Sequence, residues 1–142
     1  MEQLQFREGL LPTQDYLSLR AAVGWLTRDA VAAEQGLQGS LYLVSAWLGG
    51  QAVGAARIVG DGATVFYIQD VIVRPDCQGQ GIGDGLMRHV LAYIEAHACL
   101  GAVVGLMAAV GKEVFYERYG FEARPSHRFG AGMTQFWKVP PQ

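Results

Sequence analysis

Short apolar runs separated by glycine-rich turns recur along the chain, and they predict a β-sheet. Val, Ile, Tyr, Phe and Trp are frequent in these runs, as is typical of strands. The pair Gly49-Gly50 separates two of the runs by a tight turn, which predicts a β-hairpin. The predicted strands are Leu4–Arg7, Leu41–Leu48, Ala52–Val59, Thr64–Val73, Ala102–Ala109, Phe121–Ala123 and Thr134–Val139.

Apolar residues spaced three or four apart predict helices between these strands. The clearest case begins at Ile82 and is ended by Gly101, with Ile82, Leu86, Val90 and Ile94 on one helical face. The other predicted helices are one that begins at Pro12 and carries Tyr16, Leu19 and Val23, one over Arg28–Leu37, and one over Gly111–Tyr119.

The order of these elements predicts an α+β fold of the three-layer, α/β type. A strand, a helix and a further apolar strand follow one another between Thr64 and Ala109, which predicts a parallel pair joined by a crossover helix. With 142 residues, the chain is long enough for one domain and short for two. We therefore predict a single domain over residues 1–142.

The composition excludes several classes of protein. Hydrophobic residues make up 51% of the chain and charged residues 17%, so a sizeable core is expected and intrinsic disorder is not. The net charge of −2 argues against general affinity for nucleic acid or for anionic membranes. Apolar runs fall well short of the roughly 20 residues of a transmembrane helix.

Cysteine and histidine positions argue against disulfide and metal sites. Cys77 and Cys99 lack the C-x-x-C spacing, and the N-terminus lacks the features of a signal peptide, so we predict a reduced, cytoplasmic setting. His89 and His97 are eight residues apart and His127 falls in a predicted loop. Since these spacings do not match a ligand set, we predict no metal.

The segment with the most chemical information is the glycine-rich turn that follows the strand Thr64–Val73. Glycines alternate from Gly79 to Gly85, and a helix begins directly after them. Glycines let backbone approach an anion, and a helix N-terminus supplies unpaired N–H groups, so this order suits phosphate binding. Glycines that only shape a loop are the plainer interpretation. Leu86 at the third glycine position excludes a Rossmann fingerprint, and no Gly-Lys-Ser/Thr follows to make a P-loop.

At this turn the chain resembles the GNAT superfamily of N-acetyltransferases. The sequence from Gln78 to Gly83 fits the family pattern (Gln/Arg)-x-x-Gly-x-(Gly/Ala), and the preceding strand ends in Val73-Arg74-Pro75 as in that family. The resemblance implies a central mixed sheet of six to seven strands with helices on both sides. It also implies that acetyl-coenzyme A binds by its pyrophosphate to the backbone of Gln78, Gly79, Gln80, Gly81, Ile82 and Gly83.

The same resemblance assigns roles to the strand before the turn. In the family, backbone N–H groups at the positions of Val71 and Val73 meet the pantetheine arm and the thioester carbonyl. Asp70 interrupts the apolar strand, and we predict that it attracts the ammonium of the acceptor or takes its proton through water. A solvent-facing or structural carboxylate is the alternative. Polyamine-acetylating relatives carry two acidic residues here, whereas this chain has Gln69 before Asp70.

A second motif, Phe115 to Phe121, resembles the family signature Phe-Tyr-x-x-x-Gly-Phe. The resemblance implies that Tyr116 lies near the sulfur of coenzyme A and protonates the departing thiolate. A phenol with a pKa near ~10 stays protonated at neutral pH, as such an acid requires. Packing in an aromatic cluster is the other interpretation of Tyr116.

These residues together predict an acyltransferase that moves an acetyl group from acetyl-coenzyme A to a primary amine of a small molecule. A polyamine or an arylalkylamine is the expected acceptor, attacked directly in a ternary complex. The alternatives are acetylation of a protein amino group, a coenzyme A-binding module without catalysis, and a nucleotide-binding protein. The apolar segment Gln135–Val139 is a possible homodimer contact.

Overall fold

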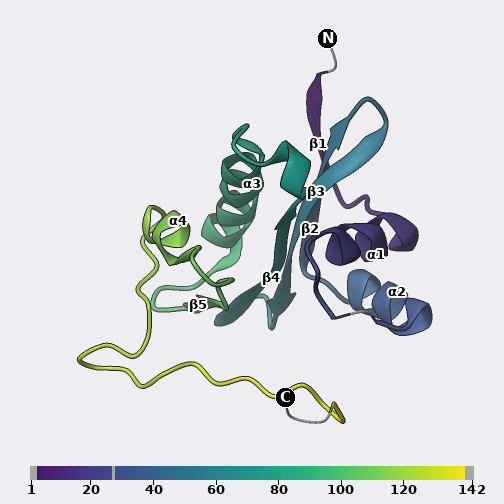
Figure 1. Ribbon diagram of the computed structural model, residues 1–142. Coiled ribbons are helices and arrows are strands. Elements are labelled where there is room, and N and C mark those ends of the chain that lie inside the picture. Colours follow the sequence, from purple (N-terminus) through teal and green to yellow (C-terminus); the bar gives the residue numbers. More distant parts are fainter. Residues whose placement is uncertain (1–2, 27, 140–142) are drawn as a thin grey trace. The chain divides into compact units, whose positions relative to one another are not determined.

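The computed structural model describes residues 3–26 and 28–139, which form two compact units. The first unit ends at Leu106 and the second begins at Met107. Figure 1 labels the α-helices and strands. The elements of the first unit are β1 (Leu4–Glu8), α1 (Thr13–Ala22), α2 (Ala30–Gln38), β2 (Tyr42–Leu48), β3 (Gln51–Gly60), β4 (Val65–Val73), the 3-10 turn η1 (Pro75–Cys77), α3 (Ile82–His97) and β5 (Val103–Leu106).

The first unit is built on a mixed sheet of five strands in the order β1-β2-β3-β4-β5. Strands β1 to β4 are antiparallel neighbours, and β5 runs parallel to β4. Helix α3 packs on β2, β3 and β4, while α1 packs on β3 and β4 and on α2. Since α3 covers one face and α1 and α2 the other (Figure 1), the three-layer α+β fold predicted from the sequence is confirmed.

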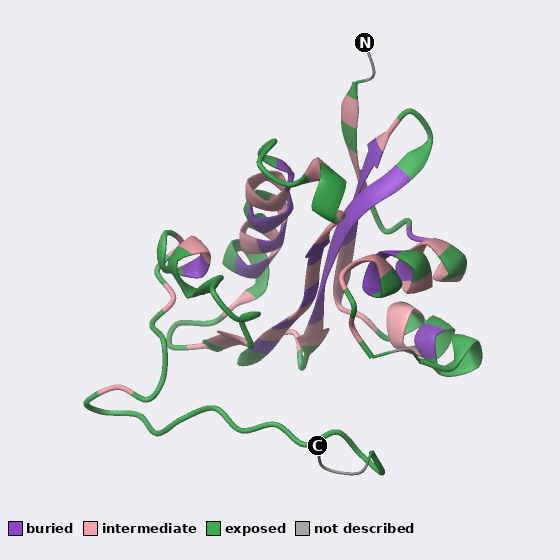
Figure 2. Cartoon of the chain, in the orientation of Figure 1, coloured by how far each residue is buried: buried purple, intermediate pink, exposed green. Residues whose placement is uncertain are grey.

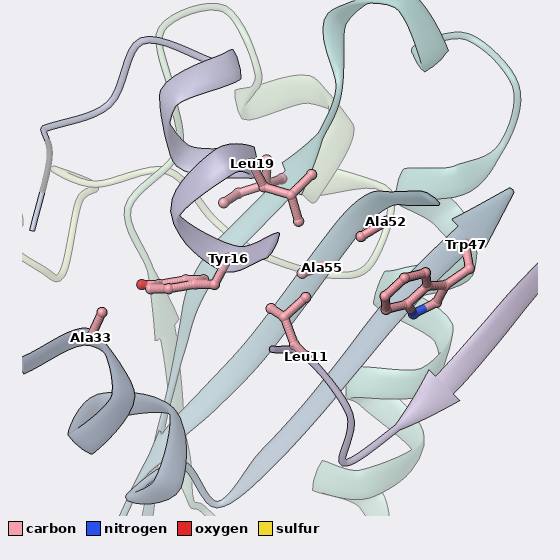
Figure 3. Packing of buried hydrophobic residues seen from close by; sticks show 8 residues of the cluster. Leu11, Tyr16, Leu19, Ala33, Trp47, Ala52 and Ala55 are labelled. Atoms are coloured by element: carbon pink, nitrogen blue, oxygen red, sulfur yellow. The ribbon is translucent and has the colours of Figure 1, made fainter. Parts of the chain in front are cut away.

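Two apolar clusters fix the helices on the sheet. On one side, one buried cluster includes Tyr16 and Leu19 of α1, Trp47 of β2 and Ile72 of β4. Figure 3 labels Tyr16, Leu19 and Trp47 within it. On the other side, α3 buries the face that its sequence periodicity predicts, which comprises Ile82, Leu86, Met87, Val90 and Ile94. The buried positions concentrate in the sheet and in the inward faces of α1 and α3 (Figure 2).

Gly54 of β3 makes the close approach of α3 possible. A Cβ atom there would lie 2.8 Å from the carbonyl oxygen of Ile72, and 3.2 Å and 3.3 Å from the side chains of Ile82 and Leu86. The backbone of β4 cannot give way without disturbing the ladder, so this position tolerates only hydrogen as a side chain.

The second unit contains one short helix, α4 (Glu113–Glu117), and irregular backbone. Gly120 lies after the helix with φ = 90°, a left-handed conformation that glycine adopts readily at the end of a helix. Within the described residues this unit has no strand, so the predicted strands Phe121–Ala123 and Thr134–Val139 are wrong, and the sheet has five strands rather than six or seven. Their apolar content gives strand propensity, but neither segment has a ladder partner.

The predicted strand Ala102–Ala109 is also longer than the observed β5, because β5 ends where its pairing with β4 ends. Among the helices of the described ranges, none combines the length and the apolar character that crossing a bilayer requires.

We predict that Gly54→Ala lowers the free energy of unfolding by about 1–3 kcal/mol, because the added methyl group overpacks the β3–α3 contact. Gly105→Ala is the matched control, since a Cβ at Gly105 of β5 meets no described atom within 4 Å. The control should change stability by less than about 0.5 kcal/mol. Urea denaturation measures both, and equal stabilities of the two variants would contradict the prediction.

Candidate active site

A β-bulge interrupts β4 at Asp70. The pairing register with β3 shifts there, so that two residues of β4, Asp70 and Val71, lie opposite the single residue Ala56. The backbone of Asp70 is left-handed, with φ = 63°, a conformation that Asp adopts more readily than most residues. Such bulges bend a strand and redirect its backbone groups, and they are frequent beside active sites.

Beyond the bulge, β4 has one sheet neighbour instead of two. The parallel ladder joins Val65–Ile68 to Val103–Leu106, and within the described residues it goes no further. The remaining part, Gln69–Val73, pairs with β3 alone. The side of this part that faces away from β3 is therefore an open edge, with backbone groups outside the sheet ladder.

Two N–H groups of this open edge belong to Val71 and Val73. The N–H of Arg74 donates to the carbonyl oxygen of Val53 in β3, at 2.8 Å. Because successive residues of a strand direct their N–H groups to opposite edges, the N–H of Ile72 also faces β3. Those of Val71 and Val73 then face the open edge, where they can hold the carbonyl groups of an extended ligand.

The glycine-rich turn joins the end of β4 to the start of α3. Gly79 and Gly81 have φ = 81° and 83°, and Gly81 is the N-cap residue of α3. No side chain of the described residues caps this helix, so the first N–H groups of α3 are available to an anion. Alternation of left-handed glycines with other conformations turns successive N–H groups toward one side, which forms an anion-binding concavity.

Asp84 in the first turn of α3 is paired along the helix. Its Oδ2 accepts a hydrogen bond from Nε of Arg88 at 2.7 Å. This i,i+4 pair offsets the carboxylate charge beside the glycine-rich turn, which an incoming phosphate would otherwise oppose.

The Asp70 carboxylate is buried and accepts hydrogen bonds from four side chains. Oδ2 accepts from the Tyr16 hydroxyl at 2.5 Å and from Nε of Arg57 at 3.1 Å. Oδ1 accepts from Nη1 of Arg20 at 2.7 Å and from Nε2 of Gln69 at 2.8 Å. The side chain is only 2% exposed, so this is a buried ion network and not a carboxylate open to solvent.

The two buried arginines tie this carboxylate to the helices. Arg20 also donates to the carbonyl oxygen of Leu26 at 2.9 Å, in the segment between α1 and α2. Arg57 also donates to the carbonyl oxygen of Gly36 at 3.2 Å and to Oγ of Ser40 at 3.1 Å. The network therefore links α1, α2, β3 and the bulge of β4. Burial, and then the hydrogen bond to Asp70, raise the pKa of Tyr16, so its hydroxyl remains a donor.

Sequence analysis does not identify Tyr16 and Arg20 as site residues. Tyr16 reads as one more apolar position of α1, and its hydroxyl reaches a partner 54 residues away. Arg20 does carry a signal, since it is a charged residue one helical turn after Tyr16 on the face that packs against the sheet. A buried arginine needs an anionic partner, and Asp70 is the polar interruption of the central strand.

Tyr116 lies in the second unit, on α4, and is buried among aromatic rings. It makes edge-to-face contacts with Phe115 and Phe121, at centroid distances of 5.0 Å and 6.4 Å. Burial raises the pKa of the Tyr116 phenol to about 12. The phenol is therefore fully protonated at neutral pH, and it can donate but does not act as a base.

Cys77 does not have the character of a nucleophile. Burial and the charge of Asp76 raise the pKa of its thiol, so the thiolate form is disfavoured. In the described part of the chain, no three His, Cys, Asp or Glu side chains are grouped as a metal site would require.

The first unit thus brings most of the predicted site residues into one continuous stretch. Asp70, Val71 and Val73 lie on the bulged strand, and the segment Gln78–Gly83 follows directly at the start of α3. The side chain of Ile82 is buried against the sheet, so only its backbone can serve a ligand. Tyr116 belongs to the other unit, and a role for it stays a prediction.

Comparison with known proteins gives one consistent answer. A family model described as an acetyltransferase (GNAT) domain matches residues 12–136. The crystal structure of a probable acetyltransferase from meticillin-resistant Staphylococcus aureus is similar, with a TM-score of 0.87 and 30% sequence identity. That similarity covers 95% of this chain and 100% of the other.

Two curated proteins are similar in sequence. An uncharacterized, ycf52-like N-acetyltransferase of Prochlorococcus marinus is 30% identical over 131 residues, which are 87% of this chain and 72% of that protein. The chloroplastic serotonin N-acetyltransferase 2 of Oryza sativa subsp. japonica is 33% identical over 76 residues, 54% of this chain and 37% of that protein. With a family model matched over most of the chain and a bulged β4 followed by the glycine-rich turn, the protein belongs to the GNAT acetyltransferase family and is an acyltransferase.

Proposed function

We propose that this protein transfers an acetyl group from acetyl-coenzyme A to a primary amine of a small molecule. The observation that carries the proposal is the open edge of β4, which leads directly into the uncapped N-terminus of α3. One continuous backbone stretch thus offers hydrogen-bond donors for the pantetheine arm of the coenzyme and, next to them, a binding site for its phosphates. Family membership makes the nucleotide-binding alternative untenable and favours catalysis over a binding module.

Coenzyme A would bind through backbone atoms. In this proposal the N–H groups of Gln78, Gly79, Gln80, Gly81, Ile82 and Gly83 surround the pyrophosphate. The N–H of Val73 would hold the pantetheine arm, and the N–H of Val71 would point at the thioester carbonyl. A donor at that point stabilises the oxyanion as the tetrahedral intermediate forms.

Acetyl transfer would proceed by direct attack. The neutral amine nitrogen bonds to the thioester carbon, the C–S bond then breaks, and the thiolate takes a proton. The raised pKa of the Cys77 thiol argues against an acetyl-cysteine intermediate. We assign the proton donor to Tyr116, whose phenol stays protonated at neutral pH. This role requires both units to work as one catalytic domain over residues 1–142.

The contacts of Asp70 support the structural alternative over the role of a base. Its oxygens already accept hydrogen bonds from four side chains, two of them guanidinium groups. An ammonium would have to compete with those arginines for the carboxylate. We therefore propose that Asp70 fixes the bulge, and that the amine proton passes to water.

The acceptor is then less suited to be a polyamine, because the carboxylate expected to attract one is already engaged. The name of the rice relative favours an arylalkylamine, and a protein amino group is the remaining alternative. Location in the cytoplasm stays a prediction, as does homodimer formation through Gln135–Val139. In that segment Phe136 and Trp137 are exposed.

Gly81→Glu should abolish the thermal stabilisation that acetyl-coenzyme A gives to the native protein, because it puts bulk and negative charge where the pyrophosphate is proposed to bind. Gly101→Glu is the matched control: Gly101 has φ = 81°, nearly the same as Gly81, and both have open space around the Cβ position. Gly101→Glu introduces the same backbone strain at a site outside the glycine-rich turn. Native-like stabilisation of a folded Gly81→Glu variant would contradict the assignment of the turn.

Tyr116→Phe should lower kcat by roughly 10- to 1,000-fold and leave the affinity for coenzyme A close to native, because it removes only the hydroxyl. Since the pKa of the phenol is about 12, the native enzyme should show no loss of activity from Tyr116 ionisation up to about pH 10. Steady-state thiol release measures both. Tyr93→Phe on α3 serves as the control, and equal kcat values for the two variants would make Tyr116 a packing residue.

Asp70→Asn should lower the free energy of unfolding by about 3–5 kcal/mol, because two buried guanidinium groups lose their counter-charge. Asp84→Asn breaks an exposed i,i+4 pair and should cost about 0.5 kcal/mol. Chemical denaturation compares the two. A stable Asp70→Asn enzyme whose kcat/KM deficit shrinks between about pH 6 and 9 would instead restore the role of a base.

A further inference from the structure

Three arginines surround the buried Asp70 carboxylate on the face of the sheet that α1 and α2 cover. Arg20 and Arg57 bond to Asp70 directly. The third, Arg28, donates from Nη1 to the Tyr16 hydroxyl at 3.2 Å, and that hydroxyl donates in turn to Asp70. Arg28 therefore lies two hydrogen bonds from the bulge of β4.

Positive charge exceeds negative charge in this group. Within residues 3–26 and 28–139, Asp70 forms ion pairs with Arg20 and Arg57, and Arg28 forms none. Nε of Arg20 is buried and has no hydrogen-bond partner in the described structure. The Tyr16 and Trp25 rings lie 5.8 Å and 5.4 Å from the Arg20 guanidinium carbon, which lowers the cost of the buried charge but supplies no anion.

Arg28 differs from its two neighbours because it is exposed. The buried arginines use their donors on Asp70, on backbone carbonyls and on Ser40. Arg28 has one such bond, to Tyr16, which leaves most of its guanidinium donors facing outward. A guanidinium held at one nitrogen and open at the others is well suited to bind a carboxylate or a phosphate by two parallel hydrogen bonds.

The position of Arg28 relates it to the acceptor and not to the coenzyme. The glycine-rich turn opens α3, which packs on the opposite face of the sheet from α1 and α2 (Figure 1). Arg28 lies between α1 and α2 in the sequence and is bonded to a residue of α1. A coenzyme bound along the open edge of β4, starting from the turn, would not occupy the α1–α2 face. That face would then be free for the acceptor, which attacks the thioester.

From this arrangement we infer that the acceptor amine carries an acidic group, a carboxylate or a phosphate, and that Arg28 binds it. The inference rests on the proposed acetyl transfer to a small-molecule amine, and it requires that amine, aromatic or not, to carry an acidic group. It makes Arg28 a specificity-determining residue, and it disfavours polycationic acceptors, which would meet the excess of arginine charge. Attraction to the acidic group would also place the amine nitrogen close to the bulge.

Matched pairs of amines test the inference, because each pair differs only in the acidic group. Tyrosine with tyramine tests a carboxylate, glucosamine 6-phosphate with glucosamine tests a phosphate, and spermidine tests a polycation. Turnover is measured by thiol release, and binding by the melting temperature of the protein saturated with coenzyme A. We expect the acidic member of at least one pair to be preferred by roughly 10- to 100-fold in kcat/KM, as for a charge-assisted hydrogen bond.

Arg28→Gln should remove that preference while leaving the rate with the member that lacks the acidic group within about threefold of native. Arg7→Gln is the matched control, because it removes the same charge from β1, which is not a neighbour of β4 in the sheet, and because Arg7 stacks on Trp47 of β2. It should keep the native preference.

Binding and turnover separate this inference from the proposed function. Stabilisation by an acidic amine that depends on Arg28, without acetylation of any probe, would support the inference and count against acetyl transfer to small amines. Acetylation with equal or better use of spermidine or of the amines without an acidic group would overturn the inference and leave the acetyl transfer intact. An acidic preference that survives in Arg28→Gln would also overturn it, and so would the absence of any difference in binding within both pairs.

Discussion

Salt bridges between one buried carboxylate and two buried guanidinium groups tie β4 to α1 and β3. Asp70 occupies a left-handed backbone position that other sheet residues avoid, and its side chain reaches Arg20 of α1 and Arg57 of β3. Ion pairs removed from water are costly unless their polar atoms find partners. Here both carboxylate oxygens, Nη2 of Arg20 and Nη1 of Arg57 have further hydrogen bonds, while Nε of Arg20 has none in the described structure. The bulge, and with it the open edge of β4, depends on this arrangement.

The sequence predicts best those features that local chemistry determines. The four-residue repeat of Ile82, Leu86, Val90 and Ile94 predicts α3 and its buried face, because one amphipathic helix carries its own signal, although the helix ends at His97 and not at Gly101. The glycine-rich turn is equally local, since Gly79 and Gly81 adopt positive φ values that glycine alone allows without strain.

Features that depend on distant residues escape sequence analysis. The network joins Arg20 to Asp70, which are 50 residues apart, and no sequence pattern around either residue predicts that they pair. The strand predicted at Thr134–Val139 fails for a related reason, because strand propensity cannot supply the neighbouring strand that a ladder needs. The role of Asp70 illustrates both cases: its position on β4 is evident from the sequence, but its partners decide what its charge can do.

The way in which α2 is attached has a consequence for the dynamics of the protein. Ala33 is the buried residue of this helix, and polar contacts from Arg57 to the carbonyl of Gly36 and to Ser40 hold its C-terminal end. A helix with so little buried apolar surface opens at a lower free energy than the sheet beneath it. Amide hydrogens of α2 should therefore exchange with solvent through local opening, long before those of β3, and each opening would release Arg57 from one side of its network. Local opening of α2 would thus affect the backbone of β4 through a single side chain, that of Arg57, which bonds to both elements.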